Sequence, residues 1–157
     1  MNTKFMQYLN AILTFLGVVA FIALLIHLFI NGFAFFLKYL LICGIAFLIF
    51  SLIRFLINAP RPTGYERSFS ERRAAFYKRH GIDPSHITGD AFPSRHVFSF
   101  ALIALAWFSV NWIVGATLLA LAVVFCILRV FLGAHSVLDV VVAILAAILI
   151  SALFYVL

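Results

Sequence analysis

Apolar residues run along most of this chain in long blocks, and short polar turns separate one block from the next. Turn residues stand at Asn31-Gly32, Asn111 and Gly133. A block of about 20 apolar residues crosses a bilayer as a helix, and these blocks lack the alternation of a membrane barrel. The pattern predicts an all-α, polytopic membrane helix bundle of about five transmembrane helices, at approximately 6–30, 33–57, 95–109, 112–132 and 135–157.

Composition supports the same prediction. Hydrophobic residues make up 66% of the 157 residues and charged residues 10%, with a mean hydropathy of +1.21. Soluble domains are nearer 45–50% apolar and about 25% charged, so a soluble domain is excluded. Neither a repeat nor a low-complexity tract divides the chain, and we expect residues 1–157 to form a single integral membrane domain.

The one long aqueous segment, from about residue 58 to 93, holds most of the charge. Ser68 and Glu71 form a capping-box pattern and Gly81 a stop signal, which predicts a short helix along the membrane surface. The whole chain has a net charge of +6, and six of its eleven basic residues lie in this segment beside the apolar blocks. Phospholipid headgroups or a phosphorylated lipid are therefore the expected partners, and nucleic acid is not.

Counting helices places several ionisable residues at one side of the membrane. The second helix ends there, the third begins there, and the fourth meets the fifth there. Charged groups at membrane depth cost about 2.5–3.5 kcal/mol even on mild scales, so they usually face a protein interior or a wet cavity. A single cleft could collect Arg54, Arg61, Arg95, His96, Arg129, His135 and Asp139.

His135 and Asp139 are four residues apart and would share one face of a helix. The carboxylate could then orient one ring nitrogen and leave the other free to attack, as in an oriented nucleophile or base. The alternative is an ion pair that only stabilises a helix junction. Arg54 and Arg61 suit a phosphate because their planar donor forks match its oxygens, although basic residues commonly follow membrane helices.

A second polar group stands at the start of the third helix, in Phe92-Pro93-Ser94-Arg95-His96. The helix N-terminus offers free N–H groups and a partial positive charge, and Ser94 can either cap the helix or bond an oxyanion. His96 beside such a site can donate a proton to a leaving oxygen.

Three motifs follow one another between Arg54 and Asp139, namely Arg-x6-Arg-Pro, Pro-Ser-x-His and Arg-x5-His-x3-Asp. Taken in this order, they resemble the three-part signature of the type 2 phosphatidic acid phosphatase superfamily. These are lipid phosphatases that share their site with vanadium haloperoxidases. The resemblance implies that His135 is a nucleophile forming a phosphohistidine, that Asp139 holds its ring, and that His96 protonates the leaving group and later activates water. It also implies that phosphoryl oxygens are held by Arg54, Arg61, Ser94 and Arg129.

The chain departs from the family's sequence pattern at three positions. The family usually has lysine at Arg54, serine at Leu128 and glycine at Arg95, and it commonly has six membrane helices. Arg95 is expected to add a phosphate contact that favours a diphosphate or a doubly charged headgroup. No acidic cluster suits a divalent ion, so we predict catalysis without a metal or other cofactor.

The sequence favours a membrane phosphatase that acts on phosphatidic acid, phosphatidylglycerol phosphate or undecaprenyl diphosphate. The alternative is a non-catalytic lipid-phosphate binder or transporter, which would not need His96, His135 and Asp139 together. We expect the protein in a bacterial cytoplasmic membrane. The positive-inside rule slightly favours a cytoplasmic site, whereas the site faces outward in many bacterial relatives. The sequence indicates no particular oligomeric state.

Overall fold

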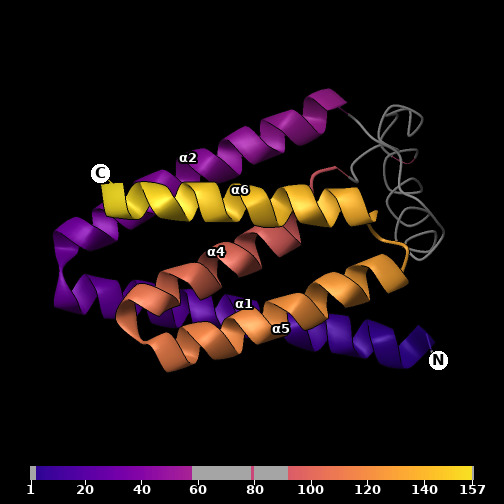
Figure 1. Ribbon diagram of the computed structural model, residues 1–157, viewed down its shortest axis with the longest axis horizontal. Helices are drawn as coiled ribbons and strands as arrows, with labels where there is room; N and C mark the ends of the chain where they lie inside the picture. Colours follow the sequence, from indigo (N-terminus) through magenta and orange to yellow (C-terminus); the bar gives the residue numbers. More distant parts are fainter. Residues whose placement is uncertain (1–2, 58–78, 80–91, 157) are drawn as a thin grey trace.

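A computed structural model describes residues 3–57, 79 and 92–156, and in these ranges the chain is helical without a strand. The predicted all-α architecture is confirmed. The surface helix predicted between Ser68 and Gly81 falls almost wholly outside the described residues. The helices, labelled as in Figure 1, are α1 (Thr3–Asn31), α2 (Phe33–Ile57), α4 (Arg95–Val110), α5 (Trp112–Phe131) and α6 (Val137–Val156).

Three of these helices are long and apolar enough to cross a membrane: α1, α2 and α5. The other two, α4 and α6, are shorter apolar helices over the residues whose side chains are described. At 1.5 Å per residue, the 16 residues of α4 extend about 24 Å, which is less than the roughly 30 Å of a hydrocarbon core. The bundle is thus that of a helical membrane protein, with α4 as its shortest helix.

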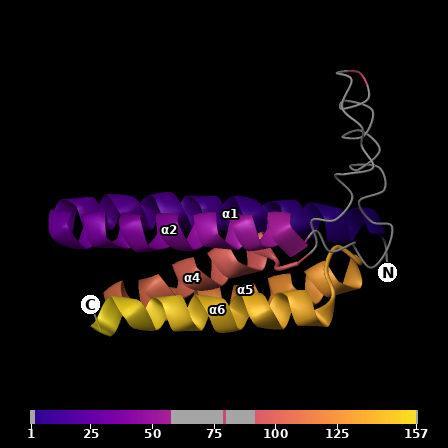
Figure 2. The same ribbon diagram turned by 90° about the horizontal axis from the view of Figure 1, so that it is seen from above.

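The helices form two layers, with α1 and α2 in one and α4, α5 and α6 in the other (Figure 2). The N-terminal end of α1, the C-terminal end of α2, the start of α4 and the α5–α6 junction all lie at the same end of the molecule (Figure 1). This is the arrangement that counting helices predicts. It brings the polar segments of α2, α4 and the junction to one end of the bundle.

Helix α4 contributes to both apolar clusters of the core. One cluster joins α2, α4 and α6 with Cys126 of α5, and there the Phe50 and Phe98 rings stack with centroids 4.1 Å apart. The other joins α1, α4 and α5, and there the Phe100 and Phe125 rings lie 5.6 Å apart. Helix α4 therefore packs against each of the other four described helices and lies at the centre of the bundle.

The turn predicted at Asn111 is confirmed, and this residue serves both helices that it joins. Its backbone N–H donates to the carbonyl of Trp107 at the end of α4, and its side-chain oxygen accepts from the N–H groups of Ile113 and Val114 at the start of α5. Asparagine is among the preferred N-cap residues because its side chain satisfies such unpaired donors. The result is a tight α4–α5 hairpin.

Candidate active site

The α5–α6 junction is a short reversal that begins at Gly133. This glycine has φ 66°, the left-handed conformation that commonly ends a helix. The N–H groups of Ala134 and His135 then both point back to the carbonyl oxygen of Arg129, at 3.1 and 3.3 Å. The backbone of His135 is thereby fastened to Arg129, and the two side chains emerge close together.

Helix α6 begins at Val137, so the prediction of a helix from about His135 is wrong by two residues at this end. Ser136 precedes the helix and forms a reciprocal capping box with Asp139. The N–H of Ser136 donates to Oδ2 of Asp139 at 2.7 Å, and the N–H of Asp139 donates to Oγ of Ser136 at 3.2 Å. The N–H of His135 donates to the carbonyl of Arg129 and not to a group of α6. His135 thus lies in the turn before the helix.

His135 lies between Arg129 and Asp139, and all three side chains are buried. Nη2 of Arg129 is 2.9 Å from Nε2 of His135, and Nδ1 of His135 is 3.6 Å from Oδ2 of Asp139. A guanidinium only donates, so Nε2 is the acceptor and the proton of a neutral ring is on Nδ1, facing the carboxylate. The 3.6 Å separation is longer than a hydrogen bond, so Asp139 acts on the ring through its charge.

Ser94 joins this group through its backbone, since its N–H donates to the carbonyl of Asp139 at 3.3 Å. The side chain is fully buried, makes no capping bond to α4, and its Oγ has no hydrogen-bond partner. Ser94 thus occupies the N-cap position of α4, but its side chain does not cap the helix. A buried hydroxyl without a partner is unfavourable, which makes Ser94 Oγ available to an incoming anion.

Arg54 is 5% exposed and lies in the last turn of α2. It follows Phe50 by one helical turn and so shares the face that packs on Phe98, in the first turn of α4. This puts the Arg54 side chain on the side of α2 that faces the start of α4. Arg61, its predicted partner in phosphate binding, lies outside the described residues.

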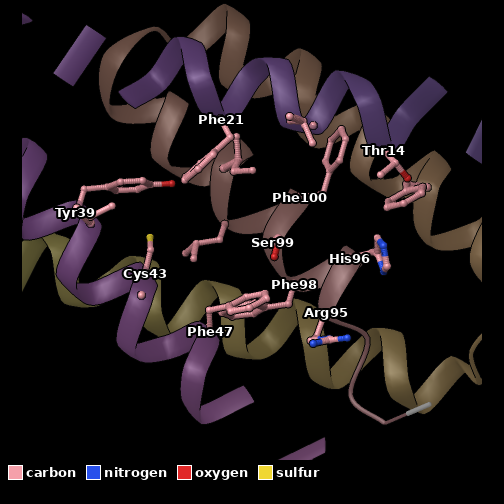
Figure 3. Close-up of a pocket in the computed structure, with 17 residues that line it drawn as sticks. Thr14, Phe21, Tyr39, Cys43, Phe47, Arg95, His96, Phe98, Ser99 and Phe100 are labelled. Carbon is pink, nitrogen blue, oxygen red and sulfur yellow. The ribbon is translucent and has the colours of Figure 1, made fainter. Parts of the chain in front are cut away.

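A cavity of about 590 Å³ opens between α1, α2 and α4, with Phe125 of α5 also in its wall. Its lining is mostly apolar. Figure 3 shows Arg95 and His96 on one side of it and Tyr39 and Cys43 on the other. Phe47 also lines it and lies under Arg95, whose guanidinium carbon is 5.9 Å from the ring centroid, within the range of a cation–π contact. The cavity thus carries two basic groups at one end of an apolar space.

Four of the predicted site residues therefore come together around the junction, namely Ser94, Arg129, His135 and Asp139. His96 is exposed and lines the cavity beside Arg95. Among the residues that the structure describes, no three His, Cys, Asp or Glu side chains group as a metal site would. Catalysis without a metal stays a prediction.

Sequence reasoning misses one polar contact of the site. Nη1 of Arg129 donates to Oδ1 of Asn10, in α1, at 3.3 Å. The only signal for this contact in the sequence is that Asn10, a polar amide, stands within the first apolar block, near the end of the block that lies on the side of the site.

Comparison with known proteins identifies a family. The family model of the PAP2 superfamily matches residues 35–157, which include every described residue of the junction group and the start of α4. No curated protein and no solved structure matches the chain.

Proposed function

The chain belongs to the PAP2 superfamily, whose members are phosphatases that act on phosphate esters, and from this premise we propose that it is a membrane lipid phosphatase working through a phosphohistidine. The observation that carries the proposal is the orientation of His135. Its Nε2 lone pair points at the guanidinium of Arg129, and its Nδ1 faces the carboxylate of Asp139.

In the first step, Nε2 of His135 attacks phosphorus in line with the bond to the leaving oxygen. An N–P bond forms, the P–O bond to the lipid alcohol or lipid phosphate breaks, and His96 gives a proton to the departing oxygen. Asp139 stabilises the positive charge that develops on the ring. In the second step His96 takes a proton from water, the oxygen of water attacks phosphorus, and the N–P bond breaks to release inorganic phosphate.

Three positive side chains and a helix N-terminus hold the phosphoryl oxygens in this proposal. Arg129 is beside Nε2, Arg54 is buried at the end of α2, and Arg61 is assigned by its place in the motif. Ser94 supplies a buried hydroxyl next to the first N–H groups of α4. Phosphoryl transfer depends mostly on positioning and on neutralising the equatorial oxygens, which these groups can do without a metal.

The cavity supports a lipid as the substrate. It is large enough for a hydrocarbon chain, and ligand pockets of about 300–1,000 Å³ are typical of small-molecule sites. The leaving oxygen joins the phosphoryl group to the tail, so in this proposal it lies between the junction group and the end of the cavity that Arg95 and His96 line. His96 lines the cavity at its basic end, which suits a residue that protonates this oxygen.

The proposal is tested by phosphate release in detergent, with EDTA present, from phosphatidic acid, phosphatidylglycerol phosphate and undecaprenyl diphosphate. We expect wild type to release phosphate from at least one of these lipids and His135→Ala to release none above background. The same lipids are then tested for binding to both proteins. Binding without release by wild type would support the non-catalytic binder instead, and equal release by both proteins would exclude His135 as the nucleophile.

A further inference from the structure

The guanidinium of Arg129 has contacts on several sides in the buried junction. Nη2 donates to His135 at 2.9 Å, Nη1 donates to Asn10 at 3.3 Å, and the guanidinium carbon lies 5.9 Å from the centroid of the Phe125 ring. Only Asn10 among these partners comes from α1, and it precedes the part of the chain that matches the family model. The partner on the Nη1 side is thus supplied by this chain's own first helix.

Helix α1 is well suited to hold such a contact. Trp107 of α4 donates from its indole nitrogen to the carbonyl of Ala20 at 3.0 Å, which ties the middle of α1 to α4. Two turns nearer the site, Thr14 lines the cavity and donates to the carbonyl of Asn10 at 2.8 Å. Asn10 is therefore carried on a helix that packs against the core, so its amide oxygen has a defined position relative to Arg129.

The chemistry of the amide fits this place. A guanidinium has five N–H groups, and the amide oxygen of Asn10 accepts from one of them. An amide oxygen fixes the guanidinium plane without neutralising its charge. A carboxylate at the same position would bind Arg129 more strongly and compete with the phosphoryl group for that charge.

We propose that Asn10 is a positioning residue of the phosphatase reaction, one that fixes the orientation of Arg129 while leaving the arginine charge to the substrate. The inference rests on the proposed function, because it assigns Arg129 to the phosphoryl group. It adds a residue of α1 to the described site residues of α2, α4 and the α5–α6 junction.

The test compares Asn10→Asp, Asn10→Ala and Asn10→Gln with wild type. Asn31→Asp is the matched control, since Asn31 lies at the other end of α1 and donates to the carbonyl of His27. For each protein, kcat and KM are measured on the best lipid of the panel. Thermal unfolding is measured with and without inorganic phosphate, a probe of anion binding that needs no turnover.

We expect Asn10→Asp to unfold at or above the wild-type temperature, because it keeps the bond to Arg129. It should nevertheless raise KM and lower kcat/KM by about tenfold or more, and shrink the stabilisation by phosphate. Asn10→Ala should lower kcat more than it raises KM, and Asn10→Gln should recover part of that loss. Asn31→Asp should retain wild-type kcat/KM and phosphate stabilisation.

The inference is overturned if Asn10→Asp keeps the wild-type kcat/KM and phosphate stabilisation, or if Asn31→Asp loses as much as Asn10→Asp. Absence of His135-dependent release from wild type would instead refute the proposed function. In that case, the rise in unfolding temperature that phosphate causes would still be compared between Asn10→Asp and wild type. This comparison would decide whether Asn10 affects the binding of an anion at Arg129. If, in addition, phosphate did not stabilise wild type, both the proposed function and the role of Asn10 would be overturned.

Discussion

The guanidinium of Arg129 donates to Nε2 of His135, the nitrogen that attacks phosphorus in the proposed reaction. This bond selects the His135 tautomer that carries its proton on Nδ1, and Nδ1 faces the carboxylate of Asp139. A phosphoryl group that enters the site offers Arg129 charged oxygens in place of the neutral ring, and charge-assisted bonds are the stronger ones. Binding of the substrate would thus release Nε2 for attack while Arg129 remains next to the group being transferred.

At the residue scale, Arg95 offers a test of substrate preference. Its guanidinium lies over Phe47 at the basic end of the cavity, where it could bind a second phosphate. We expect Arg95→Gly to reduce the preference for a diphosphate lipid over a monophosphate lipid by about tenfold, the size of one charge-assisted hydrogen bond. The measurement is the ratio of kcat/KM for the two lipids, with Arg95→Lys as the variant that keeps the charge. An unchanged ratio in Arg95→Gly would remove Arg95 from the phosphate site.

Residues of the site differ in how far the sequence can predict them. The grouping of His135, Asp139 and Arg129 follows from motif spacing because these residues are near neighbours in the chain. The contact between Asn10 and Arg129 joins positions 119 residues apart. Such a contact depends on how α1 packs against α4 and α5, and neither hydropathy nor spacing specifies that packing.

At the element scale, the α5–α6 junction depends on Gly133. A side chain at φ 66° costs about 1–2 kcal/mol, and relief of this strain would shift the backbone that fastens His135 to Arg129. We expect Gly133→Ala to lower the free energy of unfolding by about this amount and to reduce kcat by about tenfold or more. Gly32→Ala, in the α1–α2 turn at the opposite end, should keep the wild-type kcat. Equal kcat values for both variants would show that the junction does not depend on the left-handed glycine.

The helix boundaries illustrate which local sequence signals are sufficient to predict where a helix begins and ends. The apolar block from Phe33 to Ile57 predicts α2 to the residue, because Gly32 and the polar segment after Ile57 bound it clearly. The start of α6 differs from the prediction because the turn at Gly133 extends through Ser136, with the N–H of His135 still bonded to the carbonyl of Arg129. Ser136 followed three residues later by Asp139 is itself a capping pattern, so the sequence did contain a signal for a helix that begins at Val137.

At the scale of the whole molecule, an apolar cavity lies between α1, α2 and α4, with Arg95 and His96 at one end of it (Figure 3). Gly44 of α2 lines this cavity, and a Cβ built there meets no atom within 4 Å. We expect Gly44→Phe to fill part of the space and to lower kcat/KM about tenfold or more for a long-chain lipid phosphate, with little change for a short-chain phosphate ester.

The matched control is Leu48→Phe, which adds a similar ring to the outer face of α2, where Leu48 is 68% exposed. This variant should hydrolyse both substrates as wild type does. If Gly44→Phe slowed the two substrates equally, or neither of them, the cavity would not be where the tail binds.

The central claim is that His135 carries the phosphoryl group during turnover, and the most direct measurement is to trap that intermediate. Wild type and His96→Ala are mixed with a lipid substrate labelled in the transferred phosphate, quenched in alkali, digested and mapped by mass spectrometry. The account predicts an acid-labile phosphate on His135 in both proteins, which forms and is hydrolysed more slowly in His96→Ala because His96 serves both steps. Rapid phosphate release with no label on His135, or with label on another residue, would contradict it.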